Sequence, residues 1–156
     1  MPVTSATIRS MHWSDVESVA ALEQQLFPVD AWSPEAFWAE LALVPQTRCY
    51  IVAVDSDEQI VGYAGLFNAG SDADIQTVAV DPDAQGRGIG RLLLRSLLDT
   101  ARSRGSSRVF LEVRSDNASA IAMYLAHGFE QLNVRRDYYA QGVDAVVMRL
   151  MVDPHE

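Results

Sequence analysis

The sequence has little cysteine, few basic residues and no long apolar run. Its single cysteine, Cys49, excludes an intrachain disulfide framework and a zinc site built from several cysteines. No apolar stretch is long enough to cross a membrane as a helix, and no basic leader precedes an apolar segment. The three histidines are scattered and indicate no metal site. We therefore expect a cytoplasmic protein with no metal and no membrane partner.

Basic residues are outnumbered, with 12 Lys and Arg against 21 Asp and Glu, for a formal net charge of −9. Nucleic-acid binding through a basic face is disfavoured, because neutralisation of phosphates supplies most of that affinity. An acidic protein attracts a cationic substrate, although many proteins are acidic only for solubility. The sequence does not indicate an oligomeric state.

The composition is that of a folded enzyme-sized domain. A chain of 156 residues with 49% hydrophobic and 21% charged residues can bury a core of ordinary size. No internal repeat, low-complexity tract or linker divides it. We expect a single domain over residues 1–156, with residues 153–156 as a flexible tail, and with Cys49 as a small buried core residue.

Hydrophobic periodicity and turn residues predict alternating strands and helices. We expect strands at residues 6–11, 49–55, 59–68, 74–80, 107–114, 129–136 and 145–151. Helices are expected at 16–27, from Ser33 to near Pro45, from the glycine-rich segment to about Arg104, and at 117–127. Ser33 is predicted to cap the second helix, and Ser14 to form a capping box with Glu17. The order predicts an α+β fold around a mixed, mostly antiparallel sheet.

The most informative segment joins a β-branched strand to a Leu-rich helix through the turn Gln85-Gly-Arg-Gly-Ile-Gly90. Free amides at the start of a helix, together with the helix dipole, favour an anion such as phosphate. The spacing is one residue short of a dinucleotide-binding fingerprint, and no Lys-Ser/Thr pair follows as in nucleotide-triphosphate loops. The turn therefore predicts a site for another phosphorylated cofactor, with an ordinary helix start as the alternative.

Together, three segments resemble one known family. The turn matches the coenzyme A pyrophosphate-binding pattern of the GNAT acetyltransferase superfamily, and the element order is similar to the GNAT fold across essentially the whole chain. Ile75–Pro82 with its glycine turn, Leu111–Asn117 with Ala122–Phe129, and Arg135–Tyr139 resemble RimI-type ribosomal-protein N-terminal alanine acetyltransferases. The resemblance implies acetyl-CoA as cosubstrate, and the basic N-terminal peptide of a ribosomal protein as partner.

Two catalytic residues follow from the resemblance. It makes Glu112 the general base, and strand alternation places Glu112 opposite the face of Val109, Leu111 and Val113, either in solvent or held for use. It makes Tyr124 the proton donor to the departing thiolate. A tyrosine near pKa 10 is a weaker acid than a thiol near 8.5, so we favour a hydrogen bond that stabilises the thiolate. The alternative is a core aromatic beside Phe129.

The resemblance also assigns binding residues. The cofactor is expected to contact Val78, Ala79, Val80, Gly86, Arg87, Gly88, Ile89, Gly90, Arg91, Asn117 and Tyr124. The substrate peptide is expected beside Trp32 and the pair Tyr138 and Tyr139, whereas the helical spacing of Trp38 indicates a core position.

The sequence leaves two other function classes open. A GNAT enzyme that acts on a lysine side chain or a small-molecule amine would share the whole cofactor site. A non-catalytic acyl-CoA-binding module would keep the glycine turn but could dispense with Glu112 and Tyr124, and both are present.

Overall fold

The computed structural model describes residues 6–154. Its strands are β1 (Thr7–Ser10), β2 (Arg48–Val54), β3 (Ile60–Ala69), β4 (Asp72–Val80), β5 (Arg108–Arg114), β6 (Glu130–Ala140) and β7 (Val143–Met151). Its α-helices are α1 (Val16–Leu26), α2 (Pro34–Leu41), α3 (Ile89–Ser103) and α4 (Ala118–Ala126), with 3-10 turns at Trp13–Asp15 and Pro82–Ala84. The predicted element order is confirmed.

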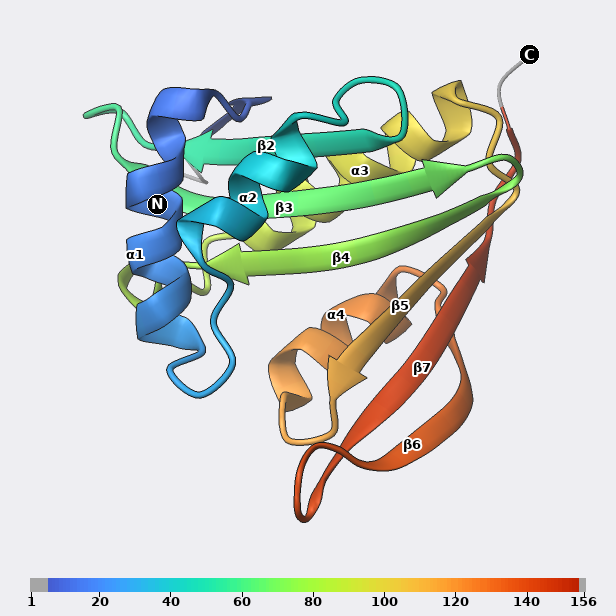
Figure 1. The fold of residues 1–156 in the computed structure, drawn as a ribbon. Helices are drawn as coiled ribbons and strands as arrows, with labels where there is room; N and C mark the ends of the chain where they lie inside the picture. Colours follow the sequence, from blue (N-terminus) through green and yellow to red (C-terminus); the bar gives the residue numbers. More distant parts are fainter. Residues whose placement is uncertain (1–5, 155–156) are drawn as a thin grey trace.

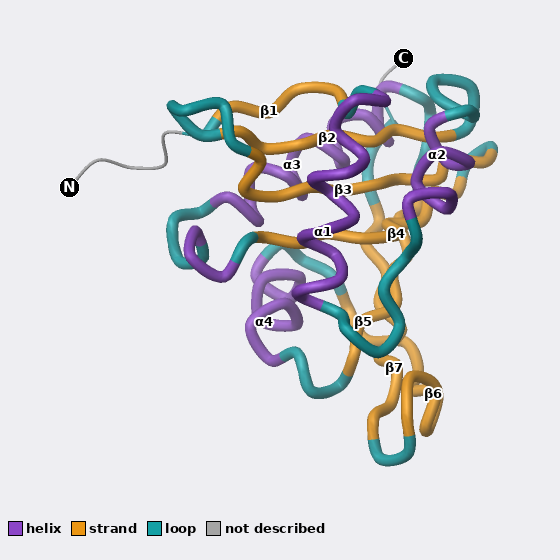
Figure 2. The backbone as a smooth tube through the Cα atoms, turned by 60° about the vertical axis from the view of Figure 1, so that its left-hand side comes forward, coloured by secondary structure: helices purple, strands orange, loops and turns teal. Residues whose placement is uncertain are grey.

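All seven described strands join one sheet in the order β1-β2-β3-β4-β5-β7-β6. Within residues 6–154, β4 and β5 form the only parallel pair, and every other pairing is antiparallel. Helices α1 and α2 cover one face of the sheet and α3 covers the other (Figures 1 and 2). The predicted α+β fold with a mixed, mostly antiparallel sheet is therefore confirmed.

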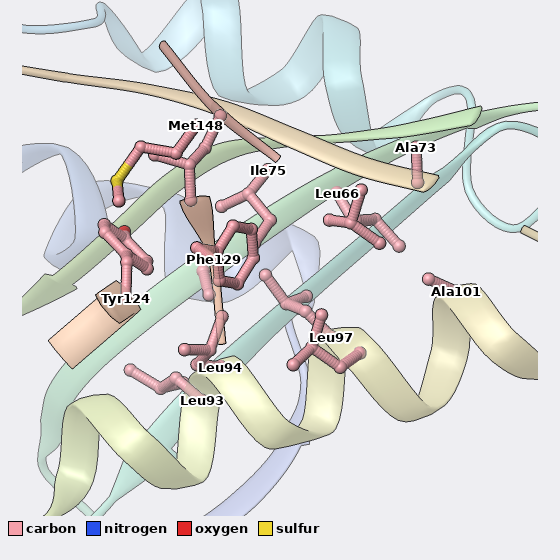
Figure 3. Close-up of a cluster of buried hydrophobic side chains, with 14 of the residues drawn as sticks. Leu66, Ala73, Ile75, Leu93, Leu94, Leu97, Ala101, Tyr124, Phe129 and Met148 are labelled. Carbon is pink, nitrogen blue, oxygen red and sulfur yellow. The ribbon is translucent and has the colours of Figure 1, made fainter. Parts of the chain in front are cut away.

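Strand alternation divides the core into two layers. Along β2, Tyr50 and Val52 pack toward α1 and α2, whereas Ile51 and Ala53 pack toward α3. The α3 layer also takes in Tyr124 of α4, and Figure 3 shows its side chains gathered between α3 and the sheet. Because helices cover both faces of the sheet at β2, the sequence of this strand is almost continuously apolar.

The turns and caps explain where the helices begin and end. The Ser33 hydroxyl accepts the Ala36 amide at 3.2 Å, as predicted for a helix N-cap. Helix α3 ends before Gly105, whose φ of +88° suits a residue without a side chain. The capping box predicted at Ser14 is wrong, because Asp15 instead accepts the His12 amide at 2.7 Å and pairs with Arg9.

Three further local predictions are wrong. Trp38 is 41% exposed, because α2 covers the sheet with Phe37 and turns the next residue outward. Cys49 is only half-buried. The last two strands are longer than predicted because a two-residue turn at Gln141 and Gly142 joins them directly. Of the predicted tail, residues 155 and 156 lie outside the described residues. No helix among residues 6–154 is long and apolar enough to cross a membrane.

Candidate active site

The cleft begins where two parallel strands separate. Strand β4 pairs with β5 only from Asp72–Ile75 to Arg108–Leu111, so the rest of β4 has no partner on that side. The divergence of β4 and β5 is visible in Figure 1. Gln76 is an extra residue in β4, since Ile75 faces Leu66 and Thr77 faces Gly65 on β3. A bulge of this kind redirects a strand at the point where it leaves its partner.

Two connected hollows fill this opening. The larger one, of about 570 Å³, lies between the end of β4, the glycine turn and the start of α4. The smaller one, of about 150 Å³, lies between β4, β5, α4 and the segment after α1. Phe27, Val78, Asn117 and Ala120 line both, so the two form one continuous cleft.

The glycine turn forms one end of the larger hollow. Gly86 and Gly88 both have φ of +81°, in the left-handed region that favours glycine. Leu92 donates to the Gly88 carbonyl at 3.1 Å, which leaves the preceding amides of the first helical turn without intrahelical acceptors. A Cβ on Gly90 would lie 3.2 Å from the sulfur of Met123, so this glycine allows α3 and α4 to approach closely. The turn has the geometry of an anion site.

The structure brings most of the predicted cofactor residues together. The larger hollow is lined by Val78, Ala79, Val80, Gly86, Gly88, Ile89, Gly90, Arg91 and Asn117. Arg87 does not line it, and Tyr124 lines the smaller hollow instead. Asn117 is the N-cap of α4, because its Oδ1 accepts the Ala120 amide at 3.2 Å. Its place at the junction of the two hollows is set by this cap.

Glu112 projects into the smaller hollow from β5. The predicted alternation along β5 is confirmed, with Val109, Leu111 and Val113 buried and Glu112 on the opposite face. The Glu112 side chain is 31% exposed, and its Oε1 lies 3.4 Å from a guanidinium nitrogen of Arg135. Glu112 is therefore neither buried among apolar groups nor free in solvent, but held at the wall of the cleft.

Tyr124 reaches the same hollow from α4. It is 5% exposed, and its ring centroid lies 5.6 Å from that of Phe129. Figure 3 shows both side chains within the buried cluster. No hydrogen bond within residues 6–154 involves its hydroxyl group. Burial, and to a smaller extent the proximity of Tyr139, raise the pKa of Tyr124 well above its ordinary value. Tyr124 is thus both a core aromatic and a lining residue of the cleft.

The predicted substrate residues separate into two groups. Trp32 and Tyr139 line the smaller hollow beside Glu112 and Tyr124. The Tyr139 hydroxyl donates to the Glu112 carbonyl at 3.4 Å. Tyr138 is 54% exposed and lies outside the hollow, in contact with the Tyr139 ring at 5.2 Å between centroids.

Sequence reasoning did not assign several of the polar residues around the cleft. Glu23, Asp30 and Gln76 line the smaller hollow, and Arg135 pairs with Glu112 at its edge. Glu23 had a readable signal, because it occupies a position in the apolar stripe of α1. Asp30 lies in a turn, Gln76 in the segment Ile75–Pro82 and Arg135 in the segment Arg135–Tyr139, and no residue pattern there identifies these three side chains as site residues.

The site can bind an anion at one end and hold a base at the other. Three carboxylates, those of Glu23, Asp30 and Glu112, line the smaller hollow. Such a surface suits a cationic amine. Among residues 6–154, no three His, Cys, Asp or Glu side chains gather in a way that could hold a metal ion.

Comparison with known proteins gives consistent matches. Residues 15–129 match the model of the acetyltransferase (GNAT) family. The chain is 44% identical over 149 residues to the N-alpha-acetyltransferase RimI of Mycobacterium tuberculosis, covering 92% of this chain and 90% of that protein. It is 36% identical over 152 residues to the ribosomal protein bS18-alanine N-acetyltransferase of Salmonella typhimurium, covering 94% and 97%. The crystal structure of the ribosomal-protein-S18-alanine N-acetyltransferase from Escherichia coli superposes with a TM-score of 0.84 at 30% identity, covering 97% of this chain and 96% of that one.

Proposed function

Because the chain belongs to the GNAT family of acetyltransferases, we propose that it transfers the acetyl group of acetyl-CoA to the α-amine of an N-terminal alanine, on a ribosomal protein. One observation carries the proposal: Glu112 and Tyr124, from two different elements, line the same hollow at the point where β4 and β5 separate. The substrates named for the relatives support the choice of amine.

The residues of the larger hollow fit acetyl-CoA. The free amides of the glycine turn would bind its pyrophosphate, and Val78, Ala79 and Val80 would contact the pantetheine arm. When bound, acetyl-CoA supplies the acetyl group as a reactive thioester. An amide of β4 that β5 leaves unpaired can donate a hydrogen bond to the thioester carbonyl oxygen, where negative charge develops.

Glu112 is the base in this proposal. The attacking nitrogen must be neutral, so a proton has to leave the ammonium group before or during attack. A free α-amine has a pKa of about 7.7–8.0, which leaves roughly a tenth of it neutral at pH 7, whereas a lysine near 10.4 is almost wholly charged. A carboxylate at the wall of the hollow, acting directly or through one water, is therefore an adequate base for an α-amine.

Tyr124 stabilises the leaving group. Its raised pKa makes full proton transfer from the phenol to a thiolate strongly uphill. Its hydroxyl has no partner among residues 6–154 and can donate a hydrogen bond to the sulfur as negative charge builds there. In this account Tyr124 remains protonated and acts through that hydrogen bond.

The acidic smaller hollow suits a basic peptide. Asp30 and Glu112 line the space into which the α-ammonium group would enter, between Trp32 and Tyr139. The net charge of −9 favours encounter with a cationic partner and disfavours nucleic acid. We further propose a single domain, since every described strand joins the same sheet, and a cytoplasmic location, since relatives are named for the acetylation of a ribosomal protein.

The position of the added acetyl group tests this function. Three versions of one basic peptide are incubated with acetyl-CoA: one with a free N-terminal alanine, one with a blocked N-terminus and an internal lysine, and one with both amines blocked. Mass spectrometry should locate the acetyl group on the free alanine amine only. Label on lysine would instead favour a broader GNAT substrate range. Thiol release only with small amines would limit the assignment to the cofactor.

A further inference from the structure

Glu23 is a buried carboxylate on the substrate side of the cleft. It lies on the apolar face of α1, is 5% exposed, and lines the same hollow as Glu112. A charged side chain in such a position is rare unless partners satisfy it. Its contacts therefore indicate what it does.

Both carboxylate oxygens of Glu23 accept hydrogen bonds. Oε2 accepts the backbone amide of Trp32 at 3.1 Å, and Oε1 accepts the hydroxyl of Tyr63. Burial raises the pKa of the Glu23 carboxyl, and the hydrogen bonds from Tyr63 and Trp32 oppose that shift. The carboxylate is thus already engaged by the protein before any substrate arrives.

These contacts close a ring of four residues from separate elements. The Trp32 ring packs on Phe37 with centroids 5.3 Å apart, and Phe37 packs edge-on against Tyr63 at 5.9 Å. Tyr63 on β3 then returns to Glu23 on α1 through its hydroxyl. The ring fixes the C-terminal end of the segment 27–33 against α1, α2 and the sheet.

The segment 27–33 forms one wall of the smaller hollow. Phe27, Asp30 and Trp32 line it, and the Asp30 carboxylate lies 4.0 Å from the Arg114 guanidinium on β5 across the cleft. That exposed and long ion pair contributes little rigidity by itself. The buried Glu23 contact with the Trp32 amide is the stronger restraint on this wall.

We propose that Glu23 is a positioning residue that holds the segment 27–33 in place as the wall of the peptide-binding hollow. The inference rests on the proposed function, because the hollow must receive a peptide. Glu23 acts through two hydrogen bonds and takes no part in proton transfer. Its loss should therefore weaken peptide binding and leave the chemical step and the acetyl-CoA site nearly unchanged.

Three variants separate positioning from chemistry. Glu23→Gln can still accept the Trp32 amide with its oxygen while its NH₂ donates to the Tyr63 oxygen, so it should stay within about threefold of wild type. Tyr63→Phe removes one of the two hydrogen bonds to Glu23 and keeps the Trp32 contact, so it should raise the peptide KM less than the double variant does. The double variant Glu23→Leu with Tyr63→Phe replaces the Glu23–Tyr63 pair by apolar groups, a change that is often nearly neutral for stability, and leaves the Trp32 amide without its acceptor.

The double variant should lose only the restraint on the segment 27–33 and keep the chemical step and the acetyl-CoA site. Its KM for an alanine-terminated peptide should rise about tenfold, equivalent to about 1.4 kcal/mol. Its kcat should stay within about threefold, and its Kd for acetyl-CoA should not change. A kcat collapse in Glu23→Gln would overturn the proposal, because it would assign the carboxylate to the chemistry. An unchanged peptide KM in the double variant would overturn it as well.

Hydrogen–deuterium exchange at the Trp32 amide gives a readout that needs no activity. Exchange should be slow in wild type and Glu23→Gln, and fast in the double variant. Rapid exchange in wild type contradicts the restraint, even if the double variant does not fold. A wild-type enzyme that leaves the alanine peptide unlabelled but shows slow exchange would reject the proposed function and keep the restraint.

Discussion

Ile75 and Leu111 form the last residue pair between β4 and β5, and the strands separate immediately beyond it. The next residue on β4 is Gln76, which stands in the bulge, and the next on β5 is Glu112. Glu112 is thus the first residue of β5 beyond its pairing with β4. Its position at the base of the opening follows from the length of one short parallel ladder.

The substitution Glu112→Gln removes the proposed base and keeps the shape of the side chain. We expect kcat for an alanine peptide to fall about 100-fold, with an unchanged Kd for acetyl-CoA. Glu130→Gln is the matched control, because Glu130 is also a strand carboxylate paired with an arginine, at 2.6 Å from Arg149. Steady-state kinetics of both variants test whether Glu112 is the base. Equal activity of Glu112→Gln and wild type would remove Glu112 from the mechanism.

The substitution Tyr124→Phe deletes only the hydroxyl that faces the cleft. The ring still fills the core beside Phe129, so the fold should persist while acyl transfer slows roughly 10- to 100-fold. Rapid-quench measurement of a single turnover isolates that step. A fully active variant would show that Tyr124 is a core aromatic and nothing more.

Stability should fall at alkaline pH because three tyrosines are buried. Burial raises the pKa values of Tyr50, Tyr63 and Tyr124, so the folded protein keeps protons that the unfolded chain loses above about pH 10. The stabilisation is complete below pH 10 and declines above it, by about 1.4 kcal/mol per pH unit for each tyrosine. Denaturant unfolding between pH 9 and 11 should show this decline, and Tyr124→Phe should reduce its slope. A flat profile in wild type would contradict the burial of these phenols.

Gly88→Ala tests the glycine turn as an anion site. The positive φ of Gly88 should cost an alanine about 1 kcal/mol of stability, and a displaced turn should weaken acetyl-CoA binding at least several-fold. Gly142→Ala is the control, because Gly142 has φ of +80° in the turn between β6 and β7, also with open space around it. Calorimetry should find similar stability losses and a changed Kd only for Gly88→Ala. Equal Kd values would place the cofactor elsewhere.

The two adjacent tyrosines of β6 should differ in function. Tyr139→Ala should raise the peptide KM several-fold, because Tyr139 lines the hollow and its hydroxyl donates a hydrogen bond to the backbone carbonyl of Glu112. Tyr138→Ala should change it little, because Tyr138 stands outside. Peptide kinetics of the pair, at saturating acetyl-CoA, distinguish them. Equal effects would mean that the whole hairpin moves to contact the substrate.

Local signals predicted the fold well. The glycine turn, the Ser33 cap and the alternation along β5 each depend on neighbouring residues, and the structure confirms all three. The prediction of a core position for Trp38 is wrong because helical spacing alone does not say which residues of a short helix reach the sheet. At the start of the first helical segment, the Asp15 carboxylate accepts the His12 amide and pairs with Arg9, whereas the predicted capping box starts from Ser14.

The site was only partly readable from the sequence. Glu112 and Tyr124 lie in recognisable segments, and the fold places both at the opening of the sheet. The pairing of Glu112 with Arg135 joins β5 to β6, and the contact of Glu23 with Trp32 joins α1 to the following segment. Such contacts depend on the tertiary arrangement. No local pattern carries them, so they required the structure.

The preference of the enzyme for an α-amine is measured most directly as the ratio of kcat/KM for two peptides that differ only in the amine they offer. One presents a free N-terminal alanine and the other a single lysine with a blocked N-terminus, both at pH 7 with saturating acetyl-CoA. The chain itself contains no lysine, so side-chain acetylation of the enzyme cannot contribute to the signal. We predict a preference for the α-amine of at least about 100-fold, in line with the different pKa values of the two amines. A ratio near one, or in favour of lysine, would contradict it.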